Sequence, residues 1–334
     1  SFERFKTANS NHKPDYLFED KIDNYRDKFY KIGETNNNLT GITVNSKNKD
    51  KLFKPKISVA NTKVNSDNVL DGLRQKTNVT NSRYQNLVDF LKSTRKNKSD
   101  IVIFPEYFIP LELLSSLVRY SEKNENLVIS GMEHITINNR AYNFIATILP
   151  ININGYKDAT IVFRLKNHYS PAEEELIIGN HIQIPNPIIQ RYHIFNWKNV
   201  YFSVFYCFEL TNILHRSALK AKIDLLVAVE YNKDVNYFSN LVESVSRDLH
   251  CYVAQVNSSD YGDTRITQPT QTYNKDIIKV KGGENNVTLT GTIEIDRLRE
   301  FQRKKYNITK NDKSFKALPP DFDVKEVLKR INNK

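Results

Sequence analysis

The chain has 334 residues, of which 39% are hydrophobic and 11% aromatic, enough to bury one large core or two modest ones. Its net charge of +11 lies on the flanks, since residues 1–56 carry 12 Lys and Arg against 8 Asp and Glu, and residues 297–334 carry 12 against 5. This distribution argues against a basic nucleic-acid groove across the central part and leaves only the flanks for such a contact.

Membrane and secretory signals are missing from the sequence. No run of 18 or more apolar residues occurs, and the N-terminal residues contain no apolar stretch of the kind found in secretory signals. The chain has only two cysteines, Cys207 and Cys251, so no disulfide framework is expected. We therefore predict a cytoplasmic protein without a membrane span. The histidines show no metal-ligand spacing, so no metal and no cofactor are expected.

The first 55 residues are rich in Asn, Lys and Asp. They predict a short helix within residues 16–32, followed by a polar linker over residues 33–51. At Lys56 the pattern changes to alternating apolar strands and amphipathic helices. In this first half of the folded part we expect helices over 83–98 and 111–124, and strands over 56–64, 100–106, 126–135, 141–150 and 158–169.

The second half repeats this alternation and ends in a basic segment. Helices are expected over 212–222 and 235–250, and strands over 199–209, 223–232, 251–259, 277–283 and 287–296. Mixed strands and helices in this order predict a layered α/β domain with helices outside the sheets. We divide the chain into a polar N-terminal extension, residues 1–55, a folded domain, residues 56–302, and a basic C-terminal tail, residues 303–334.

Three of the predicted strands end in residues capable of chemistry: Glu106, Lys166 and Cys207. Sites in open α/β sheets gather at the carboxyl ends of strands. A thiol becomes a good nucleophile only when it loses its proton, and Glu106 can accept that proton if burial raises its pKa. Lys166 can stabilise the oxyanion that forms when sulfur attacks a carbonyl. The three residues predict acyl transfer without a metal. Cys251, inside an apolar run, is expected to be inert.

The segments around these residues, FPEYFIP, FRLKNHYSPAEEE and FYCFE, resemble in that order the Glu, Lys and Cys motifs of the nitrilase superfamily of carbon–nitrogen hydrolases. The resemblance extends from about Lys56 to Gln302. It implies an αββα sandwich and a homodimer or larger homo-oligomer. It also implies a thiol-dependent hydrolase that cleaves the amide, carbamoyl or nitrile bond of a small molecule through an acyl-enzyme.

The resemblance also assigns roles to the central residues. Cys207 is the expected nucleophile, Glu106 the general base and Lys166 the oxyanion stabiliser. The backbone N–H of Phe208, directly after the nucleophile, is the expected second oxyanion donor. Cys207, Glu106 and Lys166 are therefore the residues on which the predicted activity depends.

Further candidates lie next to these motifs. A second glutamate after the lysine motif often supports the proton transfers in this family, and Glu174 is preferred here over Glu173. Tyr107, Glu173 and Glu209 are expected to contact substrate. Relatives often have an Arg two positions after the acid at Glu209, which this chain lacks. Glu230 stands at a strand end where relatives have small or amide residues, so its carboxylate would favour an amine or guanidinium on the substrate.

Two other functions stay open at this point. Residue 1 is Ser rather than Met, which together with the polar start and the basic flanks favours excision from a larger protein. In that hypothesis the chain resembles the nitrilase-like domain fused to bacterial reverse transcriptases in antiphage defence, with the flanks contacting the polymerase part or nucleic acid. In the other, the sandwich serves only for dimerisation, although the intact Glu–Lys–Cys set argues against it. The sequence does not specify the substrate.

Overall fold

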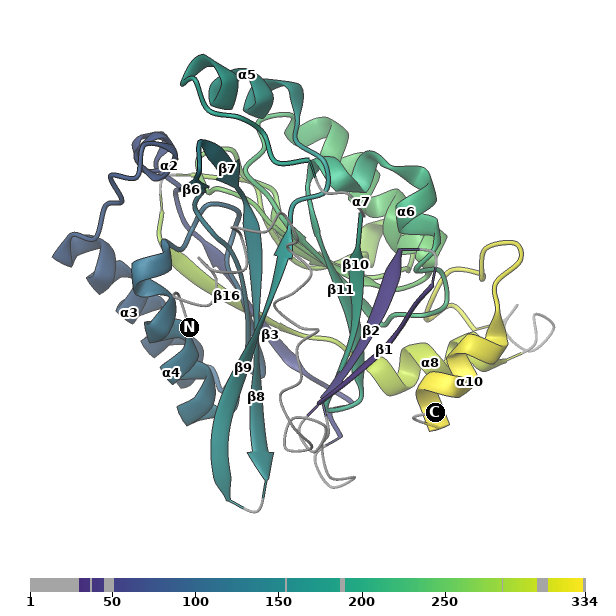
Figure 1. Ribbon diagram of the computed structural model, residues 1–334. Helices are drawn as coiled ribbons and strands as arrows, with labels where there is room; N and C mark the ends of the chain where they lie inside the picture. Colours follow the sequence, from purple (N-terminus) through teal and green to yellow (C-terminus); the bar gives the residue numbers. More distant parts are fainter. Residues whose placement is uncertain are drawn as a thin grey trace.

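The computed structural model describes residues 30–36, 38–44, 51–153, 155–186, 190–283, 285–304 and 312–332. In this part of the chain two β-sheets lie face to face, and helices cover the outer side of each (Figure 1). The predicted αββα sandwich is therefore confirmed. Most of the helix predicted within residues 16–32 lies outside the described residues.

The smaller sheet carries α3 (Asn81–Lys96) and α4 (Leu114–Asn124) on its outer face. Its apolar strands are parallel at the centre and antiparallel towards both edges. In sheet order the strands are β16 (Val287–Thr292), β3 (Lys56–Asn61), β4 (Ile101–Ile103), β5 (Leu127–Gly131), β8 (Phe144–Ile153) and β9 (Tyr156–Leu165).

The larger sheet is covered by α7 (Val235–Leu249) and the short α6 (Ile213–Ser217). Its three central strands, β11, β12 and β13, are parallel. In sheet order the strands are β1 (Tyr30–Asn36), β2 (Leu39–Val44), β10 (Tyr192–Trp197), β11 (Val200–Tyr206), β12 (Leu225–Val229), β13 (Tyr252–Val256), β14 (Thr264–Thr267) and β15 (Asp276–Val280).

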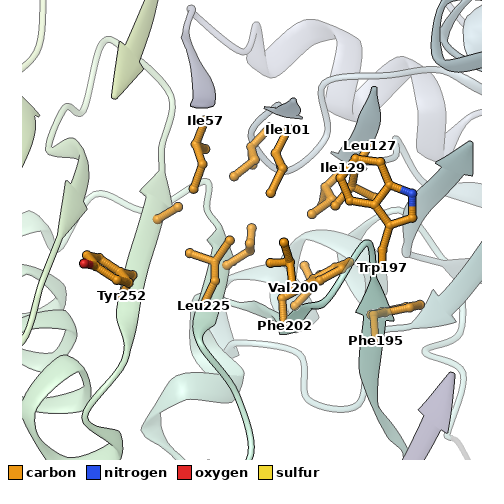
Figure 2. Close-up of a cluster of buried hydrophobic side chains, with 14 of the residues drawn as sticks. Ile57, Ile101, Leu127, Ile129, Phe195, Trp197, Val200, Phe202, Leu225 and Tyr252 are labelled. Atoms are coloured by element: carbon orange, nitrogen blue, oxygen red, sulfur yellow. The ribbon is translucent and has the colours of Figure 1, made fainter. Parts of the chain in front are cut away.

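The main core fills the space between the two sheets (Figure 2). Along β11 the alternation of a strand decides which side chains enter it. Phe202 and Tyr206 point into this core, whereas Phe205 points to the opposite face and belongs to a second apolar cluster with α7. Ile57 and Ile101 of the smaller sheet contribute from the other side. The strands read as continuous apolar runs because both of their faces are buried.

The remaining elements lie around the sandwich. A two-stranded hairpin and two short helices border the edge at which several central strands end. These are β6 (Ile135–Ile137), β7 (Arg140–Tyr142), α2 (Ser66–Leu73) and α5 (Pro171–Gly179). Two further helices, α8 (Ile295–Arg303) and α10 (Val324–Asn332), follow the last strand. The late strand predicted over 287–296 stops at Thr292, and the segment after it is helical.

The linker prediction for residues 33–51 is wrong for its first part. Strands β1 and β2 form an antiparallel hairpin there, and β2 pairs in parallel with β10. Ile42 and Val44 alternate into the core between the sheets. The Asn-rich composition of the segment conceals this short alternation, and the pairing with β10, far away in sequence, supplies the stabilisation.

The basic C-terminal segment is likewise not a simple tail. Helix α10 packs against α8, and its Arg330 is buried and hydrogen-bonds to Asp224. Arg299 of α8 donates to the same carboxylate at 2.9 and 2.6 Å. The division of the chain at residues 55 and 302 stays a prediction. Among the described residues, none of the helices has the length and apolar character that crossing a membrane requires.

Candidate active site

The three residues singled out at strand ends lie together in the structure. Glu106 comes shortly after β4 and Lys166 directly after β9, both in the smaller sheet, and Cys207 directly follows β11 in the larger one. Lys166 Nζ lies 2.8 Å from Glu106 Oε1, and Cys207 Sγ lies 3.8 Å from Glu106 Oε2. The expected convergence is therefore found, beyond the carboxyl ends of strands from both sheets.

A second carboxylate completes this cluster. Glu173 Oε2 lies 2.5 Å from Lys166 Nζ, and the hydroxyl of Tyr107 donates to Glu173 Oε1 at 2.5 Å. The amide nitrogen of Asn143 donates to Glu106 Oε1 at 3.0 Å and to Glu173 Oε1 at 3.3 Å. Two buried carboxylates thus share one ammonium and one amide, which fixes their relative positions.

Glu173, and not Glu174, is the glutamate that joins the cluster. Helix α5 has Ser170 as its N-cap, whose Oγ accepts a hydrogen bond from the Glu173 N–H, and Pro171 as its first residue. One turn further Ile177 is buried, so Glu173 lies on the inward face while Glu174 is exposed. The expected preference for Glu174 is not supported, because the phase of α5 turns Glu173 inward and Glu174 towards solvent.

The path of the backbone at Glu106 depends on Gly131 of β5. A Cβ on Gly131 would lie 2.5 Å from the Glu106 Cα, closer than van der Waals contact allows. Tyr107, the next residue, adopts a left-handed φ of 56°, which turns the chain away from the strand direction. The missing side chain of Gly131 therefore admits the segment that presents Glu106.

Burial dominates the electrostatics of the site. It raises the pKa of Glu106 to about 7, although the neighbouring Lys166 acts in the opposite direction. Burial by itself would lower the pKa of Lys166, but Glu106 and Glu173 together raise it, so the lysine stays an ammonium. Burial likewise acts to raise the pKa of Glu173, yet Lys166 holds it well below the usual range.

The thiol is neutral in the resting site. Burial raises the pKa of Cys207 well above its ordinary value, and the nearby Glu106 raises it further. A nucleophilic attack by this sulfur therefore requires a base at the moment of reaction. Glu106 is within reach for that role, and its pKa near neutrality suits a group that accepts and returns a proton.

Glu209 has a different role from the one expected. Arg164 of β9 donates to both of its oxygens, at 2.8 and 2.7 Å, and the N–H groups of Asn167 and Tyr206 donate at 2.7 and 2.9 Å. The carboxylate is fully buried and its acceptor positions are occupied. The prediction that Glu209 contacts substrate is therefore wrong.

The remaining candidates surround the cluster. Glu230 directly follows β12 and is fully buried, and its Oε2 accepts a hydrogen bond from Gln255 Nε2 at 2.8 Å. Phe208 is the first residue of a 3-10 turn, where the first N–H groups have no partner within the turn. The Tyr107 hydroxyl is bound to Glu173, as described above. The substrate contacts of these three residues stay predictions.

Several residues of the site were not singled out in the sequence. Asn143 is one of them, and it is fully buried. A polar residue between apolar neighbours in the sequence could have indicated a functional position. Asn143 Oδ1 accepts from the Tyr206 hydroxyl at 2.7 Å. His134 is another: its Nε2 lies 3.4 Å from Glu173 Oε1, its ring lies 4.9 Å from that of Tyr107, and burial lowers its pKa. Nothing in the sequence distinguishes His134 from an ordinary core histidine.

Comparison with known proteins finds likeness at the level of structure. No family model matches the chain, and no curated protein matches it. The crystal structure of XC1258 from Xanthomonas campestris, a CN-hydrolase superfamily protein with an arsenic adduct in its active site, is 15% identical with a TM-score of 0.53. The match covers 80% of this chain and 100% of XC1258.

Two structures of an amidase from Nesterenkonia, described as belonging to the nitrilase superfamily, also match. Both are 10% identical with a TM-score of 0.51, and cover 77% of this chain and 96% and 97% of the amidase. In one of them the acetamide moiety of fluoroacetamide is covalently attached to the active-site cysteine. The layers, the sheet order and these matches together show that the chain has the fold of the nitrilase, or CN-hydrolase, superfamily.

Proposed function

We propose that the chain is a thiol-dependent hydrolase that cleaves non-peptide carbon–nitrogen bonds of small molecules through an acyl intermediate on Cys207. The observation that carries this proposal is the position of the Glu106 carboxylate, 2.8 Å from Lys166 Nζ and 3.8 Å from Cys207 Sγ in a buried site. A base, a cation and a thiol in contact are sufficient for acyl transfer without a metal.

In the first step Cys207 Sγ forms a bond to the carbonyl carbon of the substrate, and its proton passes to Glu106. The π electrons of the carbonyl move to its oxygen, which becomes an oxyanion. Lys166 and the backbone N–H of Phe208 stabilise that negative charge. Because Lys166 is held as an ammonium in a buried site, its charge acts on the oxyanion with little screening by water.

In the second step the tetrahedral intermediate collapses. Glu106 returns its proton to the leaving nitrogen, the C–N bond breaks, and ammonia or an amine departs from the thioester on Cys207. Glu106 then removes a proton from water, whose oxygen attacks the thioester carbon. The C–S bond breaks, the acid is released, and the sulfur recovers a proton from Glu106.

Glu173, Asn143 and Tyr107 act as positioning residues in this scheme. Glu173 holds the ammonium of Lys166 at 2.5 Å, and Asn143 joins the two carboxylates. Tyr107 donates to the oxygen of Glu173 that does not contact Lys166. Together they keep Lys166 and Glu106 in one geometry through both steps, which preserves the orientation that rapid acyl transfer needs.

Small amides are the first substrates to test, because the matched Nesterenkonia protein with this fold is described as an amidase. Carbamoyl compounds also offer a carbonyl carbon, and nitriles offer an electrophilic carbon that is triply bonded to nitrogen, so both belong in the panel. A homodimer or larger homo-oligomer is proposed with this function. The association with a reverse transcriptase gains no support from the matched structures, and it stays a prediction, as does the non-catalytic module.

The test is hydrolysis of this panel by the wild type, Cys207→Ala and Cys251→Ala. Release of ammonia or amine is measured together with the mass of the acid-quenched protein. The wild type is expected to hydrolyse at least one compound and carry an acyl group on Cys207. Cys207→Ala should lose both signals. Cys251→Ala should keep them, because Cys251 precedes β13 whereas Cys207 follows β11, so the two cysteines lie at opposite ends of the parallel strands. Equal hydrolysis by the wild type and Cys207→Ala would refute the proposal.

A further inference from the structure

Glu230 borders the proposed active site from the side of the larger sheet. It follows β12 as Cys207 follows β11, and these two strands pair in parallel with Tyr206 opposite Val229. Cys207 and Glu230 are therefore the next residues in register on neighbouring strands. The backbone oxygen of Glu230 also accepts the N–H of Glu106 at 3.3 Å. The position of Glu230 thus connects it to both the nucleophile and the base.

The orientation of the Glu230 carboxylate is fixed by a chain of donors behind it. Arg265 Nε donates to Gln255 Oε1 at 2.9 Å, and because a guanidinium can only donate, the Gln255 oxygen must face Arg265. The Gln255 nitrogen then faces Glu230 and donates to Oε2 at 2.8 Å. Oε2 of Glu230 is therefore held as an acceptor, so a proton or a new hydrogen-bond donor at this carboxyl group must go to Oε1.

That other oxygen, Oε1, is buried, and no group among the described residues makes a hydrogen bond to it. The nearby cations are already shared: Arg265 lies 3.7 Å from Asp263 and 3.9 Å from Asp276, and Lys166 serves Glu106 and Glu173. In the described part of the chain Glu230 forms no ion pair of its own. A buried carboxyl oxygen without a partner is costly unless a ligand supplies one.

We propose that Glu230 selects substrates that carry an ammonium or guanidinium group close to the bond that is cleaved. An N–H of this cation donates to the free Oε1, and its charge balances the carboxylate. The inference rests on the proposed function and names its substrate class. A neutral substrate of the same shape leaves Oε1 unpaired and is bound less well. Burial raises the pKa of Glu230 to about 8, and a bound cation favours its ionised form.

The test uses reagents that modify the Cys207 thiol without requiring turnover. Aminoethyl and propyl methanethiosulfonate transfer groups of nearly equal size that differ in charge, and the thiolate displaces methanesulfinate in both. Modification rates at Cys207 are measured by mass spectrometry in a Cys251→Ala background. The aminoethyl reagent is expected to react faster with the parent, and Glu230→Gln should lower the aminoethyl-to-propyl rate ratio by about tenfold. Exposed Glu300→Gln should leave the ratio unchanged.

Glu230→Met is a second uncharged variant should Glu230→Gln not fold, and thermal unfolding identifies the folded one. The parent alone gives an independent measurement, since 3-aminopropanamide should protect Cys207 better than the isosteric butyramide. A rate ratio unchanged in the folded Glu230 variants, or better protection by butyramide, overturns the inference. Either result leaves the proposed hydrolase intact as long as hydrolysis depends on Cys207, so the two failures are distinguishable.

Discussion

Arg164 and Glu209 form a buried ion pair with two parallel hydrogen bonds, of 2.8 and 2.7 Å, between the two sheets. Arg164 belongs to β9 of the smaller sheet, and Glu209 to the turn that directly follows Cys207 in the larger one. The pair therefore fixes the nucleophile relative to Lys166, two residues after Arg164. The guanidinium also donates to the Val204 carbonyl at 3.0 Å.

Breaking this pair from one side should destabilise the fold strongly. Glu209→Gln and Arg164→Met each leave one buried charge without its partner, which costs roughly 3–5 kcal/mol. The Arg164→Met/Glu209→Met double variant should be less destabilised than the sum of the single variants, because no isolated charge remains. Urea denaturation of the four proteins measures these differences. Additive losses would mean that the two groups do not interact in solution.

The activity should depend on pH through Glu106. This base must be ionised to accept the thiol proton, and its pKa is about 7. With a neutral amide as substrate, the kcat/KM of the wild type is therefore expected to fall as the pH drops below about 7 and to level off above it. Glu106→Gln should lose this acid limb together with most of the activity. A wild-type profile that stays flat down to pH 5 would exclude Glu106 as the base.

Glu173 and Glu174 provide a matched pair of variants. Glu173→Gln removes the charge that holds Lys166, and should lower kcat by about a hundredfold because the oxyanion stabiliser loses its position. Glu174→Gln changes an exposed side chain on the same helix turn and should leave kcat unchanged. Steady-state kinetics with one hydrolysed amide measures the kcat of both variants. Equal effects of the two variants would contradict the positioning role of Glu173.

A methyl group at Gly131 should disturb the site through the backbone. Gly131→Ala puts a Cβ 2.5 Å from the Glu106 Cα, so the Glu106 segment must move, at a cost of about 1–3 kcal/mol. Gly179→Ala, in helix α5 with nothing within 4 Å of the added Cβ, is the control and should be neutral or slightly stabilising. Thermal unfolding and modification of Cys207 test both variants, and an unaffected Gly131→Ala would contradict the close approach.

Glu230 should make the stability of the fold depend on pH. Its pKa is raised from 4.5 to about 8 in the folded chain, so folding favours the protonated form. Its contribution to stability is complete below about pH 4.5 and is lost as the pH rises to about 8, by at most about 1.4 kcal/mol per pH unit. Relative to the wild type, Glu230→Gln should therefore gain stability across this window. Parallel stability curves for the two proteins would show that Glu230 does not titrate there.

The central part of the fold was predictable because its signals are local. The apolar runs that end in Glu106 and Cys207 are long enough to identify buried strands, and helices such as α7 have clear periodicity. Helix α5 was also within reach, since Ser170, Pro171 and Glu173 form an N-terminal capping pattern. The phase of this helix, in which Glu173 stands four residues before the buried Ile177, distinguishes Glu173 from Glu174.

Other features depend on contacts that no short segment encodes. Strand β2 is stabilised by pairing with β10, and the roles of Glu209 and His134 depend on Arg164 and Glu173, which approach from distant elements. In the sequence, an acidic residue at position 209 is equally compatible with a substrate contact and with a structural ion pair. Only the three-dimensional arrangement distinguishes the two.

The contact of Asp224 with Arg299 and Arg330 has a consequence for the order in which the molecule is made. Asp224 comes just before β12 in the middle of the larger sheet, whereas its two partners come 75 and 106 residues later in the chain. During synthesis on a ribosome this carboxylate would be buried without a counter-ion until both arginines had emerged. The larger sheet can therefore reach its final packing only after α10 has been translated, and a nascent chain arrested before Arg330 should remain sensitive to proteases.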